Sequence, residues 1–351
     1  MMPLGTRNHD ETGVSRRKFL AAAGASASLG AIAGCTGGQS TFEAEVTVTH
    51  WPLLMYAPGY QMALENGYFE EEGIKIKNIV GSSGGGTTVR NVVTGGLPFG
   101  EVATPAAVNA YYAGAPLSII GGATNSAGTI NWVAPKDSDV SDITDLKGKT
   151  VGFTSAGSVT QNTSALAVKQ ADGISVDDVE FRAMGGVSEG LTAVSEGSIA
   201  TAANLDPVFS KQQVEDRWKV VYWAKNYIDQ FQQTSIIAGP DVLENNPDAV
   251  EGYLRARSRG VDFIRDNPDE AAEIFASYND GYEKSVMQQA IKNVEPNNYY
   301  TKNQFSVPGL KLIEEGMKNI DLIDRDVEWT KIVDQSFLPE EKRINLQDAE
   351  Q

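Results

Sequence analysis

Short strand-like runs alternate with helix-like runs along most of this chain, and that order limits the folds open to it. The first units are an alternating run at 46–49, a helix at 60–66 and a second strand at 74–80. After a strand at 130–134 the order begins again, and it ends with a run at 234–238. Repeated strand–helix units favour parallel strands with helices packed against the sheet. We therefore predict an α/β fold in two lobes, each a mainly parallel sheet flanked by helices, with a cleft between the lobes.

The two predicted lobes share the chain unequally. Lobe 1 is expected at 44–131 and again at 236–351, and lobe 2 at 132–235, with crossings near Trp132 and Ile236. At 351 residues the chain is long enough for two cores of medium size. The return segment reads as mainly helical and ends in an acidic tail; its expected helices are 247–265, 268–278, 282–294 and 307–320.

Two loops of small and hydroxyl residues each lead from a strand into a helix. The first is Gly81–Val89 (GSSGGGTTV), and the second precedes a helix that runs to about Gln170. The first N–H groups of a helix lack partners in the helix and, with the positive end of its dipole, suit an oxyanion. Two such starts on facing lobes would converge on one anionic group; the alternative is two ordinary turns with serine N-caps. The candidate ligand contacts here are Ser82, Ser83, Gly85, Thr87, Thr154, Ser155 and Ser158.

Other candidate binding residues lie at strand ends, where ligands of open α/β sheets bind. Trp51 and Tyr56 follow the first strand and offer flat rings for stacking, with core packing as the alternative. The remaining candidates are Thr104 before Pro105, Trp132 at the predicted crossing, and Asn204 and Asp206 at a strand exit of lobe 2. Among them, Thr104 and Asp206 have a capping role as their alternative, and Trp132 could stiffen the hinge instead.

No metal, cofactor or catalytic site is apparent in the sequence. Cys35 is the only cysteine, and His50 is the only histidine beyond the N-terminal 35 residues. Metal-ligand spacing is therefore missing, and disulfides within the chain are excluded. No Ser-His-Asp set and no G-x-x-x-x-G-K-[ST] phosphate motif is present. We expect His50 to make structural hydrogen bonds and the protein not to be an enzyme.

The N-terminal 35 residues are expected to direct export and lipid attachment. Ser15–Leu20 (SRRKFL) matches a twin-arginine export signal, and the apolar run of small residues after it is too short to span a membrane. That run ends in IAGC at Cys35, which resembles a lipobox. We predict a signal peptide at 1–34, a lipid on Cys35, a flexible tether at 35–43 and a location on the extracellular face of the cell membrane. A buried cysteine behind a chance apolar run is the alternative.

The chain is strongly acidic, with a formal net charge of −17. No basic stripe is available to meet phosphates, which argues against a nucleic acid as partner. Dispersed acidic side chains keep a protein hydrated in concentrated salt, where long-range repulsion is screened. We therefore expect a protein adapted to high salt.

Several motifs follow one another between about Val46 and Arg265 and carry a family resemblance. They are Glu65–Ile74 (ENGYFEEEGI), the Gly-rich loop, Gly95–Gly100, Ala113–Leu117, Asp145–Gly152, and Ser195–Ala202 with Asp206-Pro207. In this order they resemble the periplasmic substrate-binding proteins of the SsuA/THI5-like type, which covers nitrate, sulfonate, taurine and thiamine-precursor binders.

The resemblance implies a two-lobed, periplasmic-binding-protein-like fold of type II, whose lobes close on a ligand by hinge motion. It implies a protein that captures a small anion such as nitrate, an alkanesulfonate or taurine and delivers it to an ABC permease and its ATPase. We expect it to be a monomer. Where the family has GEVDA, this chain has Gly197–Thr201 (GSIAT), so the family's carboxylate is absent there.

Two alternatives stay open. The ligand could be a thiamine-precursor pyrimidine or another heteroaromatic, stacked on Trp51 and paired with Asp206. No arginine stands out as a pocket residue, which argues against a strongly charged ligand. The alternative of another class is an enzyme of the same fold, as in pyrimidine or menaquinone biosynthesis, although the Cys-rich iron-binding segment of the pyrimidine-forming relatives is missing.

Overall fold

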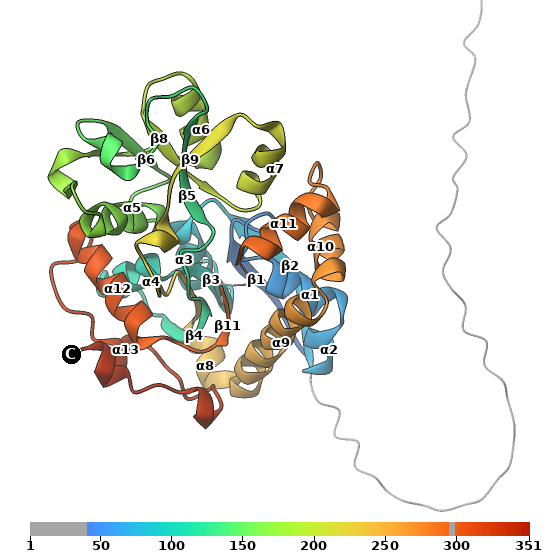
Figure 1. Cartoon of the computed structure of the whole chain (residues 1–351). Coiled ribbons are helices and arrows are strands. Elements are labelled where there is room, and N and C mark those ends of the chain that lie inside the picture. The colour runs from blue at the N-terminus through green and yellow to red at the C-terminus, as the bar shows by residue number, and fades with distance from the viewer. Residues whose placement is uncertain (1–40, 295–298) are drawn as a thin grey trace, which may run out of the picture. The chain divides into compact units, whose positions relative to one another are not determined.

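The computed structural model describes residues 41–294 and 299–351. The predicted signal peptide at 1–34, Cys35 and most of the tether lie outside these described residues. Within the described ranges, no helix has the length and apolar character needed to cross a bilayer. Two β-sheets with helices packed against them make up this part of the chain (Figure 1).

The first sheet has six strands in the order β11-β4-β10-β3-β1-β2. β1 pairs in parallel with β2 and β3, whereas β10 is antiparallel to β3 and β4, and β11 is antiparallel to β4. The strands are β1 (Phe42–Thr49), β2 (Ile74–Ser82), β3 (Phe99–Ala103), β4 (Ser118–Thr124), β10 (Thr234–Ala238) and β11 (Tyr300–Asn303).

The second sheet has five strands in the order β7-β6-β8-β5-β9. β6 is parallel to β7 and β8, whereas β5 is antiparallel to β8 and β9. The strands are β5 (Ile130–Pro135), β6 (Thr150–Phe153), β7 (Glu180–Ala183), β8 (Thr201–Leu205) and β9 (Trp218–Trp223).

The pairing in both sheets is mixed, which corrects the prediction of mainly parallel sheets. β5 and β10 each follow a strand of the other sheet, because β4 precedes β5 and β9 precedes β10. A strand that enters from another sheet needs no helical crossover and is not forced to run parallel to its neighbours. Both strands therefore lie antiparallel to the strands beside them.

Helices cover the two sheets, and several begin with a proline, whose missing N–H costs nothing in the first turn. We call the first sheet with its helices lobe 1, and the second sheet with its helices lobe 2. The lobe 1 helices are α1 (Pro58–Glu65), α2 (Tyr68–Glu71), α3 (Gly85–Val93), α4 (Thr104–Tyr112), α8 (Pro240–Asn245), α9 (Pro247–Asp266), α10 (Pro268–Ser277) and α11 (Lys284–Val294). The lobe 2 helices are α5 (Val159–Gln170), α6 (Val187–Ser195) and α7 (Val208–Glu215).

Beyond α11 the chain continues to pack on the rest of the protein. α12 (Val307–Asn319) contacts both α4 and α5, and α13 (Trp329–Ile332) follows it. The four helices predicted for the return segment are confirmed as α9, α10, α11 and α12, whereas the expected acidic tail is not a free tail. Trp329 is fully buried, and Val333 forms a parallel bridge with Ile119 of β4. Short 3-10 turns complete the described elements at Ile143–Leu146, Val176–Asp178, Ala224–Asn226, Glu340–Lys342 and Leu346–Ala349.

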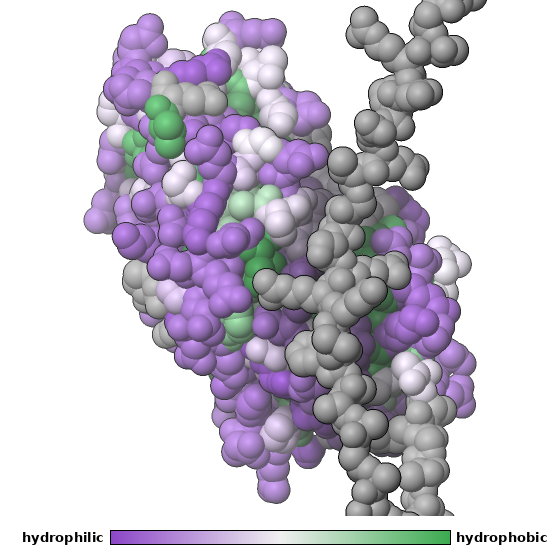
Figure 2. All heavy atoms as spheres, turned by 90° about the vertical axis from the view of Figure 1, so that its right-hand side faces the viewer, coloured by the Kyte–Doolittle hydropathy of each residue, from purple (hydrophilic) through white to green (hydrophobic). Residues whose placement is uncertain are grey.

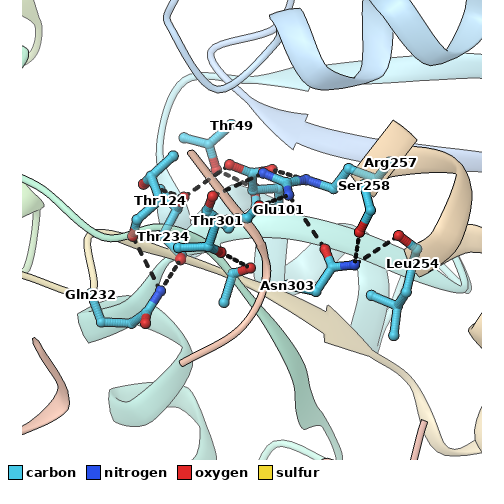
Figure 3. A network of polar contacts seen from close by, with 12 residues as sticks. Thr49, Glu101, Thr124, Gln232, Thr234, Leu254, Arg257, Ser258, Thr301 and Asn303 are labelled. Carbon is cyan, nitrogen blue, oxygen red and sulfur yellow. Dashed lines mark hydrogen bonds and ion pairs between the residues drawn. The ribbon is translucent and has the colours of Figure 1, made fainter. Parts of the chain in front are cut away.

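A buried ion pair fixes α9 to the middle of the first sheet (Figure 3). Arg257 Nε lies 3.3 Å from Glu101 Oε2, and the two side chains are 1% and 0% exposed. Arg257 also donates to the carbonyl oxygens of Ala123 and Thr301, and Thr234 Oγ1 donates to Glu101 Oε1. A buried charge is tolerated only when it is paired and hydrogen-bonded, and both groups here are. The network gives lobe 1 a rigid core.

Candidate functional site

A cavity of about 320 Å³ lies where the loops of the two lobes meet. On the lobe 1 side it is bounded by the end of β1, the residues after it and the β2–α3 turn. On the lobe 2 side it is bounded by the β6–α5 turn and the residues before α6. A Cβ placed on Gly84 would lie 4.0 Å from Ser155 Oγ, so the two predicted loops face each other closely.

The β2–α3 turn presents backbone donors to this cavity. Ser83, Gly85 and Thr87 line it, as do Gly84 and Gly86. α3 has no side-chain cap, and among the described residues no acceptor is present for the N–H groups of Gly85 and Gly86. A Cβ on Gly85 would lie 2.5 Å from the Cβ of Ala106, so glycine is needed for α3 to pack on α4. An unsatisfied helix start is an anion-binding arrangement.

The β6–α5 turn supplies hydroxyl groups from lobe 2. Thr154, Ser155, Ser158 and Thr160 all line the cavity. Ser158 Oγ accepts from the Gln161 N–H at 3.2 Å, so this serine is also the N-cap of α5. Thr160 Oγ1 lies 2.8 Å from Thr154 Oγ1 and 2.9 Å from Ser158 Oγ, which holds the three hydroxyls together. Contact of either loop with a ligand stays a prediction.

Two predicted hydroxyl residues lie outside the cavity lining. Ser82 Oγ donates to the Gly84 carbonyl at 3.2 Å and lies 2.6 Å from Thr88 Oγ1. Thr104 is fully buried, and its Oγ1 lies 2.8 Å from Ser235 Oγ in the neighbouring strand β10. Both therefore position the backbone around the cavity and do not line it.

Two predicted tryptophans also lie away from the cavity lining. The Trp51 ring packs edge-on against Tyr278 at 5.6 Å between centroids. Trp132 is fully buried in β5, stacks on Tyr222 at 4.7 Å and donates from Nε1 to the Gly152 carbonyl. Both rings are packed in or against the core, which for Trp51 is the alternative considered above. Tyr56 does line the cavity, with its hydroxyl accepting from Gln233 Nε2 at 2.8 Å.

The predicted lobe 2 pair Asn204 and Asp206 is buried beneath the strand exit. Asn204 Nδ2 donates to Gln212 Oε1. Asp206 Oδ1 accepts from the N–H and hydroxyl of Ser210, and Oδ2 accepts from Asn293 Nδ2 at 2.9 Å. Desolvation raises the pKa of the Asp206 carboxyl to about 6. The polar atoms of both side chains thus have partners within the protein, and their contact with a ligand stays a prediction.

Arg90 is a cavity-lining residue that sequence reasoning missed. It lines the cavity from α3, is solvent-exposed, and donates from Nη2 to Thr87 Oγ1 at 2.9 Å. In the part of the chain that the structure describes, no carboxylate forms an ion pair with Arg90, and none lines the cavity. Its position three residues after Thr87, one helical turn on, is the signal that would have found it. An acidic protein thus keeps one positive and no negative side chain at this site.

The cavity lining also includes the imidazole of His50 and a wall of apolar side chains. His50 lies at the end of β1, and desolvation lowers the pKa of its imidazole. The apolar wall consists of Leu54, Ala103, Ala106, Val159, Val187 and Leu205. Such a wall suits a short hydrocarbon group next to the charged end of a ligand.

The cavity floor is tied to the buried ion-pair network (Figure 3). Thr49 lines the cavity, and its Oγ1 donates to the Glu101 carbonyl at 2.9 Å. The same Oγ1 lies 2.7 Å from Thr88 Oγ1, the hydroxyl that also contacts Ser82. Hydrogen bonds therefore hold the floor to the lobe 1 core. Across the described residues, no group of three or more His, Cys, Asp and Glu side chains could hold a metal ion.

Comparison with known proteins identifies the family of the chain. The model of the family described as NMT1/THI5 like matches residues 55–271, which is more than half of the chain. A Bacillus subtilis (strain 168) protein named as a candidate aliphatic sulfonates-binding protein is 23% identical over 79% of this chain and 82% of its own length.

Solved structures show the same two-lobed fold. The periplasmic aliphatic sulphonate binding protein SsuA of Escherichia coli matches with a TM-score of 0.70 at 18% identity, over 86% of this chain and 95% of its own. The periplasmic nitrate-binding protein NrtA of Synechocystis PCC 6803 matches with a TM-score of 0.66 at 12% identity, over 85% of this chain and 87% of its own. Both structures are of periplasmic binding proteins, which confirms the predicted two-lobed, periplasmic-binding-protein-like fold, with mixed sheets in place of mainly parallel ones. The chain belongs to the NMT1/THI5-like family.

Proposed function

We propose that this protein is the extracellular solute-binding component of an ABC importer and that it captures a small anion, such as an alkanesulfonate, taurine or nitrate. The observation that carries the proposal is Arg90, a cation without an ion-pair partner among the described residues, in a cavity that no carboxylate lines. The facing β2–α3 and β6–α5 turns add unpaired N–H groups and hydroxyls. The names of the sulfonate- and nitrate-binding relatives support the same class of ligand.

The cavity favours an anion with a short carbon chain over nitrate. Its volume of about 320 Å³ is near the lower end of small-molecule sites, yet it leaves room beyond a single oxyanion. The apolar wall would cover a hydrocarbon group, while Arg90 and the helix starts would bind the oxyanion. The pyrimidine alternative finds less support, because Trp51 packs on Tyr278 and Asp206 is bonded to Ser210 and Asn293.

A thermal-shift comparison of the purified protein in concentrated salt tests the ligand class. Ethanesulfonate, taurine, nitrate and an aminopyrimidine would be added separately, each in excess. A ligand that binds the folded state stabilises it by roughly 2.7 kcal/mol at a hundredfold excess over its dissociation constant. We expect an alkanesulfonate to raise the melting temperature most. A shift with the aminopyrimidine alone would contradict the proposal, and chemical change of a bound ligand, followed by NMR, would show an enzyme instead.

Export, anchoring and partners belong to the same proposal. A twin-arginine signal and a lipid on Cys35 would hold the protein at the extracellular face of the membrane, as a monomer within reach of its permease and ATPase. Hydrophilic residues predominate on the face of the protein that Figure 2 shows, in keeping with a hydrated acidic surface in high salt. Replacing Cys35→Ser should release the protein from the membrane fraction into the medium; unchanged retention would rule out the lipid anchor.

A further inference from the structure

His50 holds a backbone conformation that few residues with a side chain adopt. Its φ is 58°, in the left-handed region, where Asn, Asp and His are the most frequent residues other than glycine. The His50 N–H donates to the Ser82 carbonyl at 2.8 Å, which ties the end of β1 to the end of β2 beside the Gly-rich turn. An unusual conformation next to a cavity is a reason to ask what the side chain does there.

The imidazole lies in the lining of the cavity without a hydrogen-bond partner. It lies 6.5 Å from the Tyr56 ring between centroids, and in the described part of the chain no group bonds to either ring nitrogen. The other titratable or charged residues in the lining are Tyr56, in the turn after β1, and Arg90, on α3. The β6–α5 turn and the residues before α6 contribute hydroxyl, glycine and apolar side chains only. Among the residues that line the cavity, no negative group is therefore available to a proton on His50.

An oxyanion in the cavity would place a negative charge near His50. In the free protein, desolvation and the absence of a lining carboxylate favour the neutral ring, and desolvation lowers the pKa of His50. A bound anion supplies the missing opposite charge, and protonation turns the acceptor nitrogen of the ring into a second donor. Binding and protonation then favour each other by the same free energy.

We infer that His50 is a specificity-determining residue, which takes up a proton when the cavity binds an oxyanion and so raises anion affinity as the pH falls. This inference rests on the proposed function. At high pH the site acts with Arg90 as its single cation, whereas at lower pH it offers two. Affinity rises as the pH falls through the pKa of His50 in the complex, and it levels off below the pKa in the free protein.

Calorimetric titration with ethanesulfonate between about pH 5 and pH 8 tests the inference, because this probe keeps one negative charge throughout. Two buffers with different ionisation enthalpies would report the protons taken up. For the unaltered protein we expect affinity to increase toward low pH, by at most about tenfold per pH unit, with up to one proton bound. His50→Asn should remove both the pH dependence and the proton uptake, since Asn tolerates a left-handed φ but does not titrate.

Asp206→Asn provides the matched control. The pKa of Asp206 is raised to about 6, so its carboxyl group titrates in the same pH range, but Asp206 lies outside the cavity lining. That variant should keep the pH dependence. Anion affinity that is constant with pH, or a proton uptake that persists in His50→Asn or disappears in Asp206→Asn, would overturn the inference and leave the proposed function intact. If ethanesulfonate, taurine and nitrate all fail to bind at every pH, the proposed function fails, and the inference with it.

Discussion

Arg90 is the side chain on which the proposed anion site depends most. We expect Arg90→Gln to weaken binding of the best anion by about 10- to 150-fold, because a hydrogen bond to a charged group contributes about 1.5–3 kcal/mol. The measurement is the dissociation constant in concentrated salt. Arg255→Gln is the matched control: it removes the same charge from α9, where Arg255 pairs with Glu72 and Glu251 outside the cavity. Equal losses in the two variants would mean that only net charge matters.

At the level of single residues, the sequence predicted the loops that line the cavity better than the cationic and titratable side chains there. Ser83, Gly85 and the hydroxyls of the β6–α5 turn follow from the strand–loop–helix pattern, because the chain order alone places them at helix starts. Arg90 and His50 do not follow from it. Whether Arg90 reaches the cavity depends on how α3 is rotated about its axis. His50, which also lines the cavity, has a left-handed φ that the pattern does not predict.

The contact of α5 with α12 leaves no room for a side chain at Gly316. A Cβ on Gly316 would lie 1.6 Å from Asn162 Oδ1 and 2.9 Å from Leu166 Cδ1. We expect Gly316→Ala to destabilise the protein by about 1–3 kcal/mol through overpacking. Urea unfolding measures the change. In Gly59→Ala of α1 the new methyl group would lie 3.4 Å from the Val261 side chain, so that variant should be neutral or slightly stabilising. Equal stability of the two variants would show that α12 and α5 separate freely.

The element order was predictable, but the direction of two strands was not. Prolines and glycines mark the helix ends, so the predicted helix at 247–265 matches α9 within one residue. Strand direction in the sheets depends on which lobe each strand joins. That choice is made by long-range packing, and β5 and β10 run antiparallel for this reason.

At the scale of the whole molecule, the lobes are joined by helix contacts as well as by the chain crossings between the sheets. α12 packs on α5, and α7 packs on α11, at opposite sides of the described unit (Figure 1). At the contact of α7 with α11, buried Asp206 accepts a hydrogen bond from Asn293 Nδ2. Beside it, the Lys211 ammonium lies 4.4 Å from the centre of the Tyr282 ring. Asp206, which was predicted to bind the ligand, thus lies at the contact of α7 with α11 and outside the cavity lining. Separation of α7 from α11 would break its bond to Asn293 and expose the carboxyl group to water.

The burial of Asp206 predicts how the stability of the folded protein depends on pH. The pKa of Asp206 is about 6 in the folded protein, against an ordinary value of 3.8. The contribution of Asp206 to the free energy of unfolding is therefore fully present below pH 3.8 and is lost as the pH rises through about 6. As the pH rises over that window, the unaltered protein should lose up to about 3 kcal/mol of stability relative to Asp206→Asn, whose amide does not titrate. Urea unfolding of both proteins at pH values on either side of the window measures the difference. Stability curves that run parallel would mean that Asp206 is not buried in solution, because the lobes stand open there.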